Sequence, residues 1–180
     1  KASHFLITNN VVRKIKLVEN LSERELVNPE GAGFDVRVKK FYKLEKSKSF
    51  LGVSDRKTPD IKEIKEKKKG KISFYRIKPG EYVLAETIET VNLPHNITAH
   101  PYSRSTLFRS GVSFFSNQVA PGYRGPLIFG LKNEGTVPLD LEIGARFAHV
   151  QFVFVDGGGS KYRGQWQGGR VAATKKEKQV

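Results

Sequence analysis

The sequence predicts an all-β protein, built as a β-barrel or a β-sandwich. Short segments of alternating apolar and polar residues recur along the chain, as expected for strands that bury one face. Pro-Gly, Glu-Gly and Ile-Gly pairs separate several of these segments, which is typical of turns between strands. Helix signals are few. Many short strands at this spacing are typical of β-barrels and β-sandwiches.

The strands can be assigned in chain order. In Gly33–Leu44, Phe34, Val36 and Val38 alternate with charged residues, which predicts a half-buried strand. The segment Lys71–Pro94 predicts two strands joined by a turn at Pro79-Gly80. Four further strands are expected in GVSFFSNQV (111–119), GPLIFGLKN (125–133), LDLEIG (139–144) and ARFAHVQFVFV (145–155).

Helical and irregular segments are expected near the two ends and in the middle. Ser22 has the character of an N-cap for a short helix that ends near Val27. The charged segment Asp60–Lys71 has little apolar face and predicts a solvated helix or a mobile hairpin tip. The glycines of Gly157–Ser160 predict a flexible hinge. The last residues, 174–180, are expected to be disordered.

Length and composition suggest one domain. A chain of 180 residues can form a substantial hydrophobic core. We expect one β-barrel domain at 1–156, with a basic insertion at about 45–71, followed by a hinge and C-terminal arm at 157–180. The absence of cysteine excludes disulfides and Cys-ligated metal sites.

The chain also lacks membrane and export signals. No apolar run approaches the roughly 20 residues that span a bilayer. The N-terminal segment lacks the layout of a signal peptide. We therefore expect a soluble cytoplasmic protein with no membrane partner. High lysine content without cysteine or methionine fits a thermophile or its virus.

The net charge of +14 favours polyanionic partners. Residues 39–71 hold 13 basic and 5 acidic residues, a net charge of +8. A solvated, lysine-rich insertion explains this run, and nucleic-acid binding through 39–71 and the C-terminal tail is the alternative. Few aromatic residues are interleaved for base stacking, which favours the first interpretation.

The richest candidate site is PYSRSTLFRSG (101–111). Arg104, Ser105, Thr106 and Arg109 place two guanidinium groups and two hydroxyls within six residues. Guanidinium groups match phosphate oxygens in geometry, and hydroxyls add neutral donors. If Arg104–Arg109 begins a helical turn, backbone N–H groups would join an anion site. A capped, solvated turn explains the same residues equally well.

Five segments in a fixed order resemble the dCTP deaminase/dUTPase superfamily. SRSTLFRSG (103–111) is similar to the second motif of the deaminase branch, Arg-Ser-Ser-Leu-x-Arg-x-Gly, with Thr106 in place of the second serine. The other four are NPEGAGFDVRV (28–38), APGYRGPLIFGLKNEG (120–135), GARFAHVQF (144–152) and KYRGQWQGGR (161–170). The resemblance implies a homotrimer of distorted β-barrels that binds pyrimidine deoxynucleoside triphosphates between subunits.

The resemblance also implies roles for individual residues. Ser105, Thr106 and Arg109 would contact the triphosphate or help to orient a water, whereas Arg104 would brace the loop. The backbone around Tyr123 would line the base and deoxyribose. Arm contacts to the nucleotide would come from Tyr162 and Gln165. The chain itself would require no cofactor, although Mg²⁺ would accompany a bound triphosphate.

Two positions depart from the family pattern. Family deaminases carry Asp-Pro-Gly where this chain has Ala120-Pro121-Gly122, and the Glu that moves protons is Gly130 here. Family dUTPases rely on an Asp at the Ala120 position to activate the attacking water. Alanine and glycine cannot take a proton. Because alternate residues of a strand share a face, Gly130 exposes backbone where the acid would point.

Other side chains are poor replacements for these acids. Asp35 follows a glycine-rich turn, and Glu134 belongs to a solvated turn. The histidines are expected to be structural or exposed; they are His4, His95, His100 and His149. Trp166 would stack on a base or pack the arm onto a neighbouring subunit.

Three functions therefore remain open. The first is a catalytically degenerate nucleotide-binding protein with a regulatory or structural role. The second is an active dCTP deaminase or dUTP diphosphatase that uses a non-standard acid. The third is a basic, nucleic-acid-associated β-barrel trimer.

Overall fold

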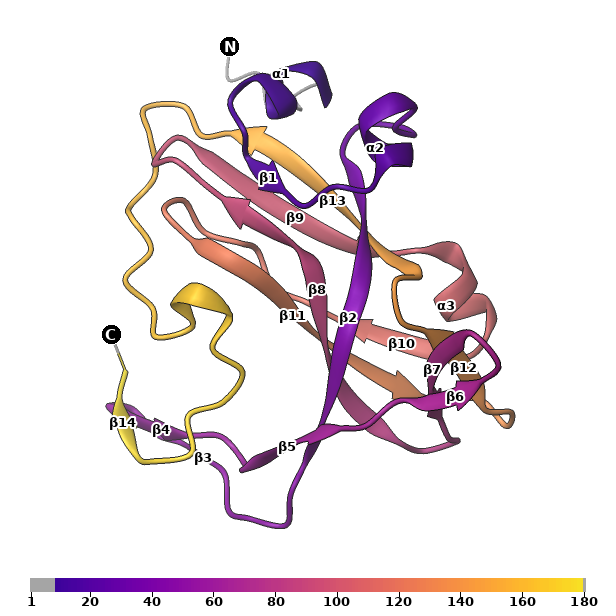
Figure 1. Ribbon diagram of the computed structural model, residues 1–180. Coiled ribbons are helices and arrows are strands. Elements are labelled where there is room, and N and C mark those ends of the chain that lie inside the picture. The colour runs from indigo at the N-terminus through magenta and orange to yellow at the C-terminus, as the bar shows by residue number, and fades with distance from the viewer. Residues whose placement is uncertain (1–8, 180) are drawn as a thin grey trace.

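The central feature of the fold is a bent, eight-stranded antiparallel sheet (Figure 1). The computed structural model describes residues 9–179, so His4 and most of the N-terminal segment lie outside it. The strand order is β10 (Val112–Phe115), β11 (Arg124–Asn133), β8 (Tyr82–Asn92), β2 (Phe34–Leu44), β13 (Arg146–Phe154) and β9 (Ile97–Ser103). Two short strands, β1 (Val18–Glu19) and β5 (Ile61–Ile64), pair with β8 and β2.

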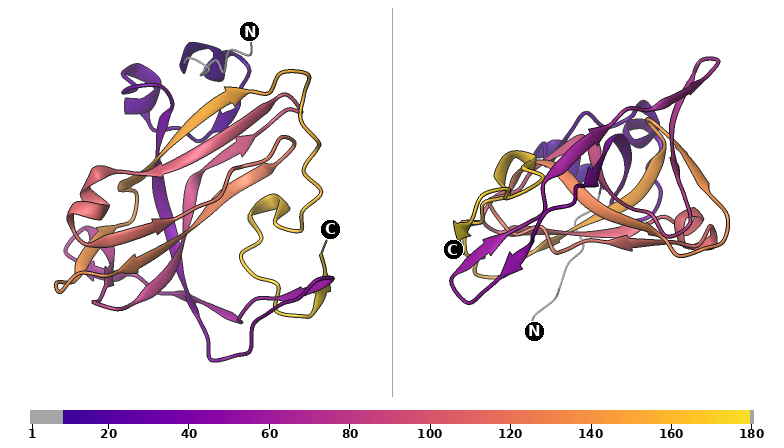
Figure 2. Two further views of the ribbon diagram at one scale, coloured as in Figure 1. Left: turned by 180° about the vertical axis from the view of Figure 1, so that it is seen from behind. Right: turned by 90° about the horizontal axis from the view of Figure 1, so that it is seen from below.

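A single bridge nearly closes this sheet into a barrel. Ala99 in β9 pairs with Val119, which lies just after β10 at the opposite edge. Their backbones exchange hydrogen bonds of 3.1 and 2.8 Å. The two edge strands therefore meet, and the view from below in Figure 2 shows the strands curving round one another toward closure. The predicted all-β, distorted barrel is confirmed.

Large aromatic side chains fill the barrel. Phe34 and Phe152 are completely buried, and they come from neighbouring strands. The ring of Phe129 lies 4.8 Å from that of Phe114 and 5.7 Å from that of Phe147. Aromatic pairs at such distances add to the stabilisation from apolar burial. The alternation noted in β2 thus corresponds to a core-facing row.

Two small sheets extend the barrel. One has the order β12 (Leu139–Glu142), β7 (Ile72–Ile77) and β6 (Lys67–Lys69). The other has the order β14 (Glu177–Lys178), β4 (Asp55–Lys57) and β3 (Phe50–Leu51). Of the two alternatives for residues 60–71, the helix is wrong, because β5 pairs with β2, and a hairpin is present, because β6 pairs with β7. The expected disorder at the end of the chain is also wrong, because β14 pairs with β4.

The helices are short. They are α1 (Asn9–Lys14), α2 (Glu23–Val27), α3 (Ser105–Arg109) and the 3₁₀ turn η1 (Gln167–Gly169). Helices α1 and α2 lie at one end of the barrel, whereas η1 belongs to the arm beside β11 (Figure 1). The Ser22 side chain accepts a hydrogen bond from the backbone of Glu25, as the N-cap pattern predicts. Among the described residues, no helix is long and apolar enough to cross a membrane.

Asn133 joins the barrel to the β6–β7–β12 sheet. It is completely buried at the end of β11. Its side-chain amide donates to the carbonyl oxygens of Ile77 at 2.9 Å and Val137 at 2.8 Å. Its oxygen accepts from the backbone of Gly135 at 2.9 Å. One side chain therefore satisfies three backbone groups from two segments, the end of β7 and the turn between β11 and β12.

We predict that Asn133→Ala lowers the free energy of unfolding by about 2–4 kcal/mol, because three backbone groups lose their partner in a buried site. Urea denaturation would measure the loss. Lys132→Ala, at the neighbouring and partly exposed position, is the control and should stay within about 0.5 kcal/mol. Equal stability of the two variants would contradict the bridging role of Asn133.

Candidate functional site

The main candidate site is a cavity of about 820 Å³ beside the β8–β11 pair. Its walls come from β8, β11, the segment that follows β10, the insertion, and the C-terminal arm (residues 157–179). Ala120 and Gly130, the two positions that depart from the family pattern, both line it. Tyr123 and Tyr162 line it as well. The structure thus brings together four of the residues that the sequence singled out.

The lining of this cavity includes no aspartate or glutamate. Glu86 lies on the same face of β8 as Leu84, which is opposite Gly130, but Glu86 is buried in other contacts. Tyr42 donates a hydrogen bond to Glu86 at 2.6 Å, and the Lys39 ammonium lies 3.5 Å away. Burial and this hydrogen bond raise the pKa of Tyr42 to about 12, which keeps it a donor. The Glu86 carboxylate is therefore engaged by Tyr42 and Lys39.

Tyr123 and Tyr162 form one wall of the cavity. Their rings meet edge-on, with centroids 5.5 Å apart. The Tyr123 hydroxyl donates to the carbonyl oxygen of Pro126 at 2.6 Å, and burial raises its pKa to about 12. The Tyr162 backbone donates to Pro121 at 2.6 Å. This contact needs Gly122, whose φ is +83° and whose missing Cβ would lie 3.2 Å from the Tyr162 nitrogen.

The arm is fixed over the cavity by the barrel. The side chain of Gln167 accepts from the backbone of Arg124 at 2.7 Å and donates to the carbonyl oxygen of Gly122 at 3.1 Å. A Cβ on Gly125 would lie 2.7 Å from the carbonyl carbon of Gly168, so the glycine permits this close approach. The GGGS segment, predicted to be a flexible hinge, is hydrogen-bonded: Gly159 donates to the carbonyl oxygen of His95 at 2.7 Å.

The insertion holds the other end of the arm. The guanidinium of Arg56 lies 4.8 Å from the centre of the Trp166 ring and donates to the side chain of Gln165. Thr58 and Ala173 exchange two hydrogen bonds, of 3.0 and 2.7 Å. Figure 1 shows the yellow arm returning to lie beside β4. Part of the basic insertion is therefore a platform for the arm, whereas the lysines of β6 are exposed.

Gln165 faces this platform. Its amide donates to the carbonyl oxygen of Lys178 at 2.9 Å, and it is not among the residues that line the cavity. Trp166 both lines the cavity and packs on Arg56 of the same chain, whereas stacking on a base and packing on a neighbouring subunit stay predictions.

The hydroxyl and guanidinium groups of α3 lie elsewhere. Ser105, Thr106 and Arg109 are exposed to solvent, and none of them lines the cavity of the same chain. Figure 1 places α3 and the arm on opposite sides of the barrel. Arg109 lies over the ring of Phe108, 5.6 Å from its centre. These three side chains can meet the cavity only from another copy of the chain.

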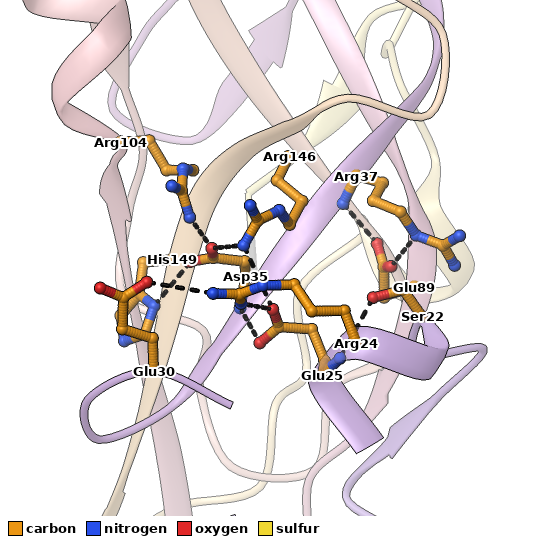
Figure 3. Close-up of polar contacts among 10 residues, drawn as sticks. All are labelled: Ser22, Arg24, Glu25, Glu30, Asp35, Arg37, Glu89, Arg104, Arg146 and His149. Atoms are coloured by element: carbon orange, nitrogen blue, oxygen red, sulfur yellow. Dashed lines mark hydrogen bonds and ion pairs between the residues drawn. The ribbon is translucent and has the colours of Figure 1, made fainter. Parts of the chain in front are cut away.

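Arg104 belongs to a buried charged cluster (Figure 3). Arg104 and Arg146 both form ion pairs with Asp35, the latter at 2.9 Å. The side chain of Asp35 is 4% exposed. Its backbone N–H donates to Glu25 at 3.0 Å. Burial, together with the neighbouring Arg146, lowers the pKa of Arg104. The cluster ties α2, β2, β13 and the start of α3 together, so Arg104 braces this loop.

His149 is also part of this cluster. Its Nδ1 lies 3.0 Å from the carboxylate of Asp35 and its Nε2 lies 3.2 Å from the carbonyl oxygen of Ala32. Both ring nitrogens are thus occupied within the fold. Figure 3 shows the ring pointing toward Asp35, which agrees with a structural role for this histidine.

Tyr82 and Arg170 also line the cavity and are not among the site residues that the sequence predicts. Alternation in β8 places Tyr82 and Leu84 on one face, which was a usable signal. Which strand pairs with β8, and in which register, is a long-range property that local patterns do not contain.

We predict that Arg56→Ala loosens the arm, because it removes both the contact with the Trp166 ring and the hydrogen bond to Gln165. Amide hydrogen exchange in residues 161–173 should become about tenfold faster, while β8 and β11 stay protected. Lys57→Ala, which removes a neighbouring cation of the same strand, is the control. Unchanged exchange in Arg56→Ala would show that Arg56 does not hold the arm.

The chain matches the family described as dCTP deaminase-like over residues 6–156. It is 33% identical over 169 residues to a dCTP deaminase of Pyrococcus furiosus, covering 93% of this chain and 95% of that protein. It is 35% identical over 143 residues to a probable deoxyuridine 5'-triphosphate nucleotidohydrolase of Methanothermobacter thermautotrophicus, covering 79% and 89%.

A solved structure of 2'-deoxycytidine 5'-triphosphate deaminase from Agrobacterium tumefaciens has the same fold, with a TM-score of 0.62 at 13% identity. The match covers 84% of this chain and 48% of that one. Fold and sequence agree: the chain belongs to the dCTP deaminase-like family.

Proposed function

We propose that this protein binds pyrimidine deoxynucleoside triphosphates and is catalytically degenerate, with a regulatory or structural role. The observation that carries this proposal is the cavity, which keeps Tyr123, Tyr162 and the covering arm but has no carboxylate in its lining. A deaminase or a nucleotide diphosphatase must move protons, and positioned acids and bases supply that step. The names of the relatives, which act on dCTP and deoxyuridine triphosphate, support this class of ligand.

We propose further that the site is completed in a homotrimer. Ser105, Thr106 and Arg109 have the chemistry for phosphate, but lie away from the cavity of their own chain. Tyr102 and Phe108, on either side of these residues in the sequence, are 50% and 58% exposed. Exposed aromatic side chains near a polar group support contact with another copy. In the trimer, α3 of one copy would supply the phosphate contacts of the next cavity.

Mg²⁺ would accompany the triphosphate rather than occupy a site of its own. Within residues 9–179, no group of three or more His, Asp or Glu side chains lies together as a metal site. Mg²⁺ commonly binds nucleotides through phosphate oxygens and water with few protein ligands. The phosphate oxygens would therefore provide most of its coordination.

An active dCTP deaminase or dUTP diphosphatase is the second candidate. The carboxylate would then have to come from another copy. The relatives with these activities in their names favour this alternative. For nucleic-acid binding we find no such support, since part of the basic insertion contacts the arm of the same chain.

We predict that dCTP and dUTP with Mg²⁺ raise the melting temperature by roughly 5–10 °C at 100 times the dissociation constant. Arg109→Ala should weaken binding by about 10–100-fold, because a charged hydrogen-bond donor to phosphate is lost. Arg76→Ala, which breaks an exposed ion pair with Asp140, is the matched control and should bind normally. Sedimentation measures the assembly in the same samples.

Two results would contradict the proposed nucleotide site, and a third the trimer. The first is the absence of any thermal shift with either nucleotide at millimolar concentration. The second is equal weakening by Arg109→Ala and Arg76→Ala, which would remove α3 from the site. A monomer that binds with full affinity would contradict the trimer.

A further inference from the structure

Tyr82 occupies the space that Gly130 leaves open. Tyr82 lies on β8 opposite Lys132, two residues from Gly130 on the facing strand. Diagonal neighbours of this kind share one face of a sheet and are within reach of an aromatic side chain. A Cβ added to Gly130 would lie 2.3 Å from the Tyr82 hydroxyl oxygen and 3.0 Å from the ring carbon that carries it. The hydroxyl therefore sits directly above the Gly130 backbone.

The Tyr82 hydroxyl differs from those of the three buried tyrosines. Those of Tyr42, Tyr75 and Tyr123 each donate a hydrogen bond of 2.6 Å to a protein oxygen. Among the residues that the structure describes, the hydroxyl of Tyr82 has no hydrogen-bond partner. Tyr82 is half-buried and lines the cavity. A polar group in this position satisfies its hydrogen bonds with water or with a ligand.

The position of the ring is well defined. The ring of Tyr82 packs against that of Phe115, with centroids 6.1 Å apart. Burial raises the pKa of Tyr82, so the hydroxyl stays protonated near neutral pH. A protonated phenol can donate one hydrogen bond and accept others, but it is not a general base at that pH.

We propose that Tyr82 is the residue that contacts the edge of the bound pyrimidine base at this wall of the cavity. This inference rests on the proposed nucleotide-binding function and names the contact that replaces an acidic side chain at position 130. A hydroxyl donates to a carbonyl oxygen and accepts from an amino group equally well. The wall is thus suited to both cytosine and uracil nucleotides.

The same geometry makes Tyr82 and Gly130 a dependent pair. Any side chain at position 130 displaces the Tyr82 hydroxyl, because the first carbon already overlaps it. An acid at position 130 and a tyrosine hydroxyl at this spot therefore exclude each other. Tyr82 determines which chemistry this wall presents to a ligand.

Tyr82→Phe tests the contact, since it removes the hydroxyl and keeps the ring. We expect it to weaken binding of both dCTP and dUTP by about 2–10-fold, the size of one net hydrogen bond. Tyr75→Phe is the matched control: it removes a hydroxyl that is bonded to Glu81 and does not line the cavity. It should bind both nucleotides as the unaltered protein does. Titration calorimetry measures the affinities.

Gly130→Ala and the double variant provide a second measurement. Gly130→Ala should weaken binding by displacing the hydroxyl, and this part of its effect should disappear when Tyr82 is already Phe. The fold-loss of affinity in the double variant should therefore be smaller than the product of the fold-losses in the two single variants. If the affinity loss of the double variant equals the product of the two single losses, the two positions act independently. The inference that the hydroxyl above Gly130 makes the contact would then be overturned.

The outcomes separate this inference from the proposed function. If the unaltered protein and Tyr75→Phe bind neither nucleotide, the proposed function fails, and the base contact of Tyr82 fails with it. If both bind and Tyr82→Phe binds equally well, the nucleotide site stands and only the role of Tyr82 is overturned. If Tyr82→Phe weakens the binding of only one nucleotide, the expectation that both bases contact the hydroxyl equally is overturned.

Discussion

The register between β8 and β11 is the constraint on which the site depends. Gly130 pairs with Leu84 and Lys132 with Tyr82, so Tyr82 and Gly130 face the cavity together. Side chains alternate along a strand, and a slip of β11 by one residue would turn Gly130 toward the core and away from Tyr82. The neighbouring core residues oppose such a slip, because Phe129 and Leu131 are buried on the other face. Barrel packing therefore determines what the cavity presents to a ligand.

A second long-range constraint is the docking of the arm. Arg56 and Gln165 are 109 residues apart in the chain and are joined at the edge of the cavity. Beside this hydrogen bond, the Arg56 guanidinium lies over the Trp166 ring, and β14 pairs with β4 through the backbone. Several modest interactions of this kind can order a segment that has little apolar surface of its own. The insertion thus has a structural role besides its charge.

Local patterns in the sequence predicted the parts of the fold that depend on local chemistry. The alternation of Phe34, Val36 and Val38 predicted β2, and Ser22 predicted the start of α2. Strand β9 escaped notice because Pro101 interrupts its pattern. Proline is tolerated there because β9 is an edge strand of the main sheet. Strands β5 and β14 were missed because they pair with β2 and β4, which are distant in sequence. The hairpins β3–β4 and β6–β7 are local, but their charged residues carry little alternating apolar pattern.

The features of the candidate site likewise divide into those that the sequence predicts and those that depend on packing. The absence of acids at Ala120 and Gly130 is readable directly from the sequence, and both positions line the cavity. The bracing position of Arg104 also agrees with the structure. The contacts of Gln165 with the insertion and the position of Tyr82 above Gly130 depend on three-dimensional packing. No local pattern could have revealed them.

The central claim is that this cavity binds a nucleotide without converting it, and a turnover assay with the protein in excess tests it most directly. The protein would be incubated with dCTP or dUTP and Mg²⁺, and deaminated nucleotide and pyrophosphate followed over hours. A cavity without an acid predicts rate constants below about 0.01 s⁻¹ for both nucleotides, at least ~100-fold under ordinary enzymes. A rate constant above about 0.1 s⁻¹ for either nucleotide would contradict the account.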